Sequence, residues 1–142
     1  MFLVDTNVIS EARKGPRSDA GVRAFFTTCA REEQRLFLAS ITVGELRRGI
    51  SAIRHRGDQD QAQRLEGWLS EVLSLYASSV LSFDSEAAQV WGELRVPHPE
   101  HALDKQIAAI ALLHDLTVVT RKTADFNGTG VKLLNPFQVA PR

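Results

Sequence analysis

The chain has 142 residues, with 17 Lys and Arg residues, 17 Asp and Glu residues and a formal net charge of zero. A net charge of zero excludes a global attraction to nucleic acid, so any nucleic-acid binding has to come from a local patch. Hydrophobic residues make up 44% and charged residues 24%, which is typical of one globular domain, here residues 1–142, and excludes disordered and fibrous classes.

The chain begins with a short apolar run, Phe2 to Val4, which predicts a buried strand that ends abruptly at Asp5. A helix is expected next, on the spacing of Val8, Ile9 and Ala12. Because ligands bind beyond the carboxyl ends of parallel strands, Asp5 stands where functional sites are usually built. An aspartate at this point is also a good helix N-cap, and this alternative stays open.

A second helix is predicted after a break at residues 13–17, with Ser18 or Asp19 as its cap. It carries Cys29, and a single cysteine excludes a disulfide framework and a cysteine metal site within one chain. Residues 36–40 predict a second strand. Two amphipathic helices then follow, over residues 43–53 and 61–76, and together they predict a helical hairpin.

The remaining elements repeat the alternation of short strands and helices. Strands are expected at residues 80–83, 116–120 and 131–134, with helices after Asp84 or Ser85 and from Asp104 to Leu113. Asp125 lies in a polar loop, residues 121–130. The alternation predicts an α/β protein with a mainly parallel sheet. Neither a targeting segment nor a stretch long enough to cross a bilayer is found, so we expect a cytoplasmic protein with no membrane contact.

Acidic residues occur at several of the predicted junctions. Asp5, Glu45, Asp104 and Asp125 would gather along one edge of a parallel sheet. Clustered carboxylates repel one another unless a divalent cation neutralises them, and oxygen ligands favour Mg²⁺ or Mn²⁺.

Each of these acids also has a structural explanation. The segment from Thr42 to Glu45 fits a capping box, in which the glutamate bonds back to the N-cap backbone. Asp104 suits the dipole of its helix as a first-turn acid, and Asp125 suits a turn. These explanations account for each residue separately but not for the recurrence of all four at one edge.

Several segments in order resemble a known family: residues 4–10, 40–49, 104–111, 116–121 with Asp125 and Phe126, and 131–137. The chain resembles PIN-domain ribonucleases, in particular the toxins of VapBC-type toxin–antitoxin pairs with an extended helical hairpin. Any one of these segments is a weak signal, but the ordered set is specific.

The resemblance implies a three-layer α/β/α sandwich with a protruding hairpin that binds Mg²⁺ or Mn²⁺ and hydrolyses RNA. It places Asp5 and Asp104 as the principal metal ligands. Glu45 would ligate through water or orient the nucleophile, and Asp125 would be the fourth acid. The supporting polar residues would be Asn7 and Thr120. Many relatives have Asn or Asp where this chain has Lys122.

The partners that we expect are an RNA substrate, a small antitoxin protein and a second copy in a homodimer, with DNA bound only through the antitoxin. Basic residues could contact RNA phosphates, although an arginine-rich helix face is usually just solvated. The candidates are Arg47, Arg48, Arg54 and Lys122.

The principal alternative is a noncatalytic PIN-fold module that binds RNA or protein and has lost its metal site. Lys122 favours it weakly and the intact acids oppose it. Phosphoaspartate enzymes and receiver domains also begin with a strand that ends in Asp. Both are minor options. The phosphoaspartate enzymes require a second acid two residues later, which is Asn7 here, and receiver domains require paired acids after the first strand and a phosphoacceptor at the end of a central strand, neither of which this chain clearly supplies.

Overall fold

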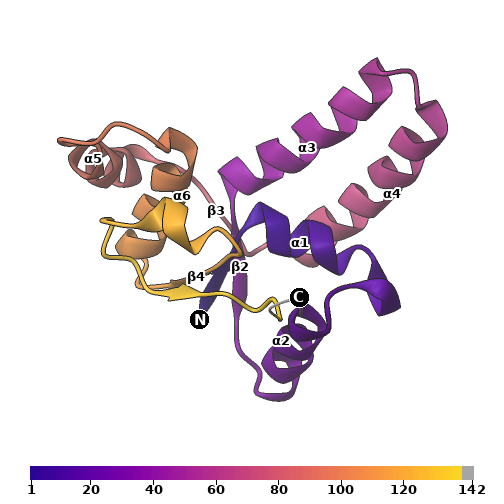
Figure 1. Ribbon diagram of the computed structural model, residues 1–142, viewed down its shortest axis with the longest axis horizontal. Coiled ribbons are helices and arrows are strands. Elements are labelled where there is room, and N and C mark those ends of the chain that lie inside the picture. Colours follow the sequence, from indigo (N-terminus) through magenta and orange to yellow (C-terminus); the bar gives the residue numbers. More distant parts are fainter. Residues whose placement is uncertain (139–142) are drawn as a thin grey trace.

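The computed structural model describes residues 1–138, which form five strands and six α-helices (Figure 1). The strands are β1 (Phe2–Val4), β2 (Leu36–Ala39), β3 (Val80–Leu81), β4 (Thr117–Val119) and β5 (Leu133–Leu134). The helices are α1 (Thr6–Ala12), α2 (Ala20–Arg31), α3 (Ser40–His55), α4 (Gln59–Leu75), α5 (Ser85–Leu94) and α6 (Ala102–Leu113), with short 3-10 helices η1 (Gly15–Arg17) and η2 (Thr123–Phe126).

The five strands form one sheet in the order β3-β2-β1-β4-β5, and every strand pair is parallel. Strand β1 is central and pairs with β4 in a register that sets Val4 beside Val119. Asp5 and Thr120, the next residue of each strand, are therefore neighbours at the carboxyl end of the sheet. The strand order reverses direction between β1 and β4, and such a switch point is where open α/β sheets bind ligands.

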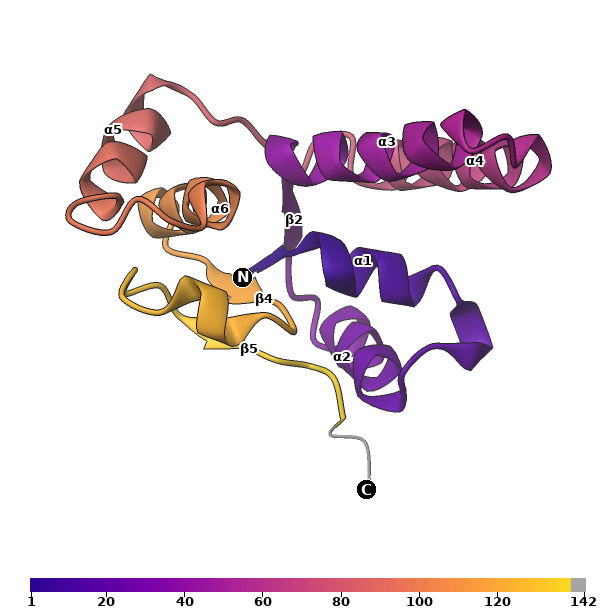
Figure 2. The same cartoon turned by 45° about the horizontal axis from the view of Figure 1, so that its top comes forward.

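Helices cover both faces of this sheet, as the alternation of buried side chains requires (Figure 2). Val4, Leu38 and Val119 pack against helices α1 to α4 in one hydrophobic cluster. Leu3 and Val118 face the opposite way and pack against α5 and α6 in a second cluster. The prediction of a three-layer α/β/α sandwich is confirmed.

Helices α3 and α4 lie side by side as a hairpin that extends well beyond α1 (Figures 1 and 2). Its contact face carries the apolar side chains predicted from helical spacing, among them Leu46, Ile50 and Leu69, all buried. Trp68 is half-buried and packs against this cluster. Asp58 caps α4 by accepting a hydrogen bond from the Gln61 amide at 3.1 Å.

The start of α3 differs from the predicted capping box. The helix begins at Ser40, directly after β2, and its N-cap residue Ala39 has no side-chain acceptor. Thr42 is therefore the third residue of the helix, and its buried hydroxyl has no hydrogen-bond partner among the described residues. Glu45 lies too far into the helix to bond back to the N-cap, so the capping-box interpretation is wrong.

The predicted loop of residues 121–130 also differs, since it contains the single-turn helix η2. The predicted cap residues Asp19 and Asp84 are confirmed: each side chain accepts a backbone N–H of the helix that it starts. Short polar helices of this kind carry no apolar periodicity, which is why the sequence did not reveal η2.

Cys29 is buried, and desolvation raises the pKa of its thiol above the usual value. A protonated thiol is a poor nucleophile and a poor metal ligand, which fits a packing role. Among residues 1–138, no helix has both the length and the apolar character needed to span a bilayer.

Candidate functional site

Asp5 lies at the junction of the central strand β1 and helix α1. Its side chain is only 2% exposed, and its backbone amide bonds to the Val119 carbonyl of β4 at 2.9 Å. One carboxylate oxygen, Oδ1, accepts the Thr6 amide at 2.8 Å, so Asp5 is also the N-cap of α1. The cap and the position for a functional carboxylate therefore coincide in one residue.

Two polar side chains fix the other carboxylate oxygen of Asp5. Oδ2 accepts the Thr120 hydroxyl at 2.8 Å and the Asn7 amide Nδ2 at 3.2 Å. The same Nδ2 donates to the Thr120 Oγ1 at 3.0 Å, and the Asn7 Oδ1 accepts the Arg121 amide at 2.9 Å. Because every polar atom of Asn7 and Thr120 is used, the network holds Asp5 in one orientation.

A second group of charged side chains lies between α6 and the segment after β4. Lys122 donates from Nζ to the Asp104 Oδ1 at 3.1 Å, while the Lys122 backbone amide donates to the Thr120 Oγ1 at 3.0 Å. The imidazole Nδ1 of His101 lies 4.0 Å from the Asp104 Oδ2 and 4.0 Å from the Asp125 Oδ1. The two groups therefore join through Thr120 and Lys122.

The electrostatics of the site follow from this arrangement. Desolvation by burial raises the pKa of the Asp5 carboxyl above its usual value, although hydrogen bonds from Thr120 and Thr6 and the charge of Lys122 oppose the shift. The nearby charge of Asp104 raises it further. Burial opposes the charge on Lys122, but the carboxylates of Asp104, Asp5 and Asp125 together raise the pKa of its ammonium group. The three acids therefore favour the charged form of Lys122.

The donor set fits a divalent cation. Asp5 accepts two hydrogen bonds on Oδ2 and one on Oδ1, which leaves one acceptor position free on Oδ1. Atoms of His101, Asp104 and Asp125 lie within 4.8 Å of one another. Carboxylate oxygens are the ligands that Mg²⁺ and Mn²⁺ take most readily. The residues present are therefore suited to such an ion.

Glu45 lies apart from this cluster, on the sixth residue of α3. It lines a cavity of about 210 Å³ between α1 and the hairpin, together with Thr6, Arg13 and Trp68. Thr6 directly follows Asp5 in the sequence, but Asp5 itself is not part of the lining. Within residues 1–138 Glu45 takes part in none of the ion pairs.

The arginines of the hairpin differ in whether they form ion pairs. Arg47 makes a bidentate pair with Glu66 of α4, with both N–O distances at 2.7 Å, and Arg54 approaches the same glutamate at 3.4 Å. These bonds tie α3 to α4. Arg48 is exposed and has no ion pair within the described part of the chain.

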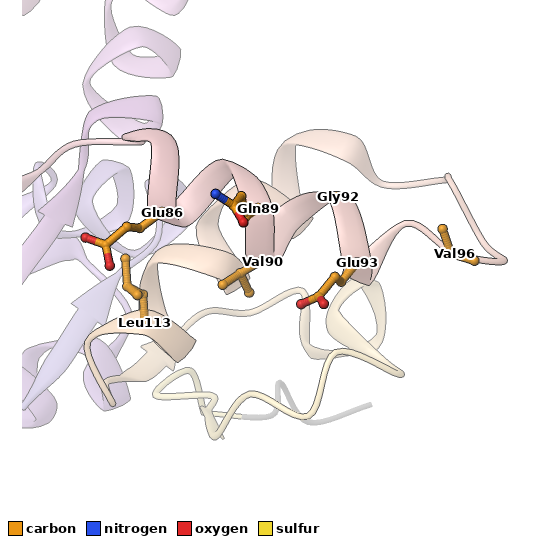
Figure 3. Close-up of a pocket in the computed structure, with 7 residues that line it drawn as sticks. All are labelled: Glu86, Gln89, Val90, Gly92, Glu93, Val96 and Leu113. Carbon is orange, nitrogen blue, oxygen red and sulfur yellow. The ribbon is translucent and has the colours of Figure 1, made fainter.

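A larger surface hollow lies elsewhere, between α5 and the end of α6 (Figure 3). Its volume is about 730 Å³, and its lining includes Glu86, Glu93 and Leu113. The lining runs along α5 and just past its end, from Glu86 to Val96, and includes none of the candidate site residues.

His101 is the site residue that the sequence analysis missed. It lies in the segment between α5 and α6, whose prolines predicted only irregular structure. The available signal was its place in the sequence, three residues before Asp104, at the start of the predicted helix.

A family model of the PIN domain matches residues 2–129. The VapC ribonuclease Y4jK of Sinorhizobium fredii is 36% identical over 99% of this chain and 100% of its own length. Toxin FitB of Neisseria gonorrhoeae is 35% identical over 96% of this chain and 99% of its own. The crystal structure of FitAcB from Neisseria gonorrhoeae superposes with a TM-score of 0.76 at 35% identity, covering 96% of this chain and 98% of that one. These matches span nearly the whole chain, and the protein belongs to the PIN-domain family.

Proposed function

We propose that this protein is a Mg²⁺- or Mn²⁺-dependent endoribonuclease that acts as the toxin of a toxin–antitoxin pair. The observation that carries the proposal is the buried Asp5 carboxylate, which Asn7 and Thr120 hold and which lies close enough to Asp104 for that charge to raise its pKa. A family relationship to a protein named as a VapC ribonuclease supports the same reaction class.

Each residue of the site has a distinct task in this proposal. Asp5 and Asp104 would hold the ion, and Asp125 would complete its shell. A bound divalent ion lowers the pKa of water and offsets negative charge on a phosphate group. Asn7 and Thr120 position Asp5, and Glu45 at the neighbouring cavity would orient the attacking water in line with the scissile bond.

RNA has to approach an acidic centre on a protein with no net charge, so local cations matter. Arg48 is exposed and available for phosphate, whereas Arg47 and Arg54 would have to leave Glu66. Lys122 is already paired with Asp104, and a phosphate oxygen would compete for its ammonium group. Arg48 and Lys122 are therefore the residues that we propose contact RNA phosphates.

The antitoxin would occupy the groove between α1, α2 and the hairpin. Two cavities of about 210 Å³ each share Arg13 and Trp68 in their linings and therefore lie next to each other. One of them is lined by Glu45, and the other runs along Ile9, Phe26 and Leu75. An amphipathic antitoxin segment with one basic side chain would bury its apolar face there and direct the cation toward Glu45.

Cleavage assays test the enzymatic proposal. The purified protein, free of any partner, is incubated with structured and unstructured RNAs in Mg²⁺ or Mn²⁺, with and without EDTA. Asp5→Asn is compared with Asp84→Asn, which makes the same substitution at the strand-to-helix junction after β3, where Asp84 caps α5. We expect EDTA and Asp5→Asn to abolish cleavage and Asp84→Asn to retain it.

The rival function is a noncatalytic RNA- or protein-binding module. The ion pair between Lys122 and Asp104 is the observation that favours it, because an ammonium group there can replace a metal ion. Absence of cleavage of every RNA, together with absence of Mn²⁺ binding in calorimetry, would establish this rival.

Co-purification tests the proposed antitoxin groove. Any small protein encoded next to this chain is co-expressed with the wild type, with Leu75→Arg in the groove and with Leu112→Arg on α6; both leucines are exposed. We expect only Leu75→Arg to weaken the complex and increase growth inhibition. Equal loss in both variants would place the partner elsewhere. The mass of the partner-free protein by light scattering tests the expected homodimer.

A further inference from the structure

His101 brings a nitrogen donor to a site otherwise composed of oxygen donors. Its Nδ1 lies 4.0 Å from Asp104 Oδ2 and 4.0 Å from Asp125 Oδ1. These carboxylates come from α6 and η2, two elements that pack against each other. The imidazole is about half exposed, so an ion can reach it from solvent.

The distances are compatible with a shared ion. Two donors at roughly 2.1 Å from one divalent ion lie at most about 4.2 Å apart. The separations of 4.0 Å between the imidazole nitrogen and each carboxylate oxygen fall inside that limit. Three evenly spaced donors that share one ion lie about 3.6 Å apart, so the imidazole and the two carboxylates would move inward by a few tenths of an ångström to bind it together.

Asp104 presents its two oxygens to different neighbours. Oδ1 accepts the Lys122 ammonium group at 3.1 Å, and Oδ2 faces His101. A cation bound on the His101 side therefore does not have to displace Lys122. Lys122 then opposes the ion only by charge repulsion and does not occupy its ligand oxygen.

The backbone around His101 is anchored on both sides. His101 precedes α6 in the left-handed conformation, with φ 55° and ψ 46°, which is costly for a residue with a side chain. Its carbonyl accepts the Lys105 amide at 2.9 Å, and the next carbonyl, of Ala102, accepts the indole N–H of Trp91 at 2.9 Å. The buried Lys105 ammonium group donates to the carbonyl of His98. These bonds fix the backbone from which the imidazole projects.

We infer that His101 is a metal ligand of the candidate site and that its imidazole makes the site bind Mn²⁺ in preference to Mg²⁺. The chemical reason is that Mg²⁺ takes almost only oxygen ligands, whereas first-row transition ions bind imidazole readily. The inference rests on the metal site of the proposed function and specifies which ion that site prefers.

Pulsed electron paramagnetic resonance of the Mn²⁺-loaded protein tests the ligand directly, because a coordinated imidazole couples its ¹⁴N nucleus to the Mn²⁺ spin. The variants are His101→Ala and, as a matched control, His98→Ala, a more exposed histidine of the same segment that contacts Glu100. We expect the coupling in the wild type and in His98→Ala and its loss in His101→Ala. Calorimetry should show the Mn²⁺/Mg²⁺ affinity ratio falling about tenfold or more in His101→Ala alone.

The outcomes separate this inference from the proposed function. If the wild type binds Mn²⁺ without nitrogen coupling and His101→Ala leaves the affinity ratio unchanged, His101 is not a ligand, while the metal nuclease stands. If the wild type binds no Mn²⁺, or if Asp5→Asn and Asp104→Asn bind it as tightly as the wild type, the proposed metal site itself fails.

Discussion

Thr120 connects the two halves of the site with a single hydroxyl. The hydroxyl donates to Asp5 and accepts from Asn7 and from the Lys122 amide. All three partners are side chains or backbone groups at the carboxyl ends of β1 and β4. Removing this hydroxyl therefore leaves several polar groups unpaired at once.

We predict that Thr120→Val, which keeps the shape of the side chain, lowers the free energy of unfolding by about 1–3 kcal/mol. It should also reduce RNA cleavage by roughly 10- to 100-fold, because Asp5, which we propose as a metal ligand, loses its orientation. Urea denaturation and initial cleavage rates measure the two effects. Thr120→Ser retains the hydroxyl and should stay near wild type in both; a serine variant as impaired as the valine variant would contradict the assigned role.

At the residue scale, the sequence pointed to the acidic residues as candidates but did not predict the side chains with which they form ion pairs. Asp5 was predictable because an apolar run ends at it, and Asn7 and Thr120 because they resemble family positions. The pairing of Lys122 with Asp104 and that of Arg47 with Glu66 depend on how α6 and the hairpin pack. Long-range contacts of this kind leave no local pattern in a single sequence.

The hairpin is closed at the surface by a network centred on Glu66. Hydrogen bonds from Arg47 are the main cause that lowers the pKa of Glu66 to about 2, with Arg54 adding to the effect. Because this pKa lies below the unfolded value, the network stabilises the fold above about pH 4.5, and the contribution is lost as the pH falls toward 2.

We predict that the Glu66 carboxyl titrates with a midpoint near 2 in the wild type and much closer to 4.5 in Arg47→Gln. Side-chain carbonyl chemical shifts followed by NMR measure both midpoints. Arg48→Gln, the neighbouring exposed arginine, serves as the control and should leave the midpoint unchanged. A midpoint near 4.5 in the wild type would show that the ion pair does not persist in solution.

The apolar contact between α3 and α4 should matter more for stability than this surface network. Leu69 is 1% exposed and Leu75 is 79% exposed, although both belong to α4. We predict that Leu69→Ala costs about 2–5 kcal/mol of unfolding free energy, whereas Leu75→Ala changes it by no more than about 0.5 kcal/mol. Denaturant titrations give both values, and similar losses would mean that the hairpin packs differently.

At the element scale, hydrophobic periodicity predicted the helices and strands, but it did not always predict the residue at which a helix begins. The capping-box pattern from Thr42 to Glu45 was outweighed by chain geometry, because β2 leads directly into a helix at Ser40. The single-turn helix η2 places Asp125 near His101. An element of one turn is too short for hydrophobic periodicity to predict it.

At the scale of the whole molecule, the all-parallel sheet brings Asp5, from the start of the chain, close to Asp104, from its last third. The reversal of strand order places β1 and β4 side by side, so Asp5 and Thr120 meet across 115 residues of sequence. This convergence was predictable from the alternation of strands and helices. Distances within the cluster and the neutralising Lys122 were not, because they depend on side-chain packing.

The anomalous diffraction of crystals soaked in Mn²⁺ tests the central claim most directly, because it locates the ion itself. We predict an anomalous peak within bonding distance of the Asp5 and Asp104 carboxylates, absent from crystals of Asp5→Asn and present in those of Asp84→Asn. A map without a peak at these carboxylates, with the Lys122 ammonium group still bound to Asp104, would contradict the metal-dependent nuclease.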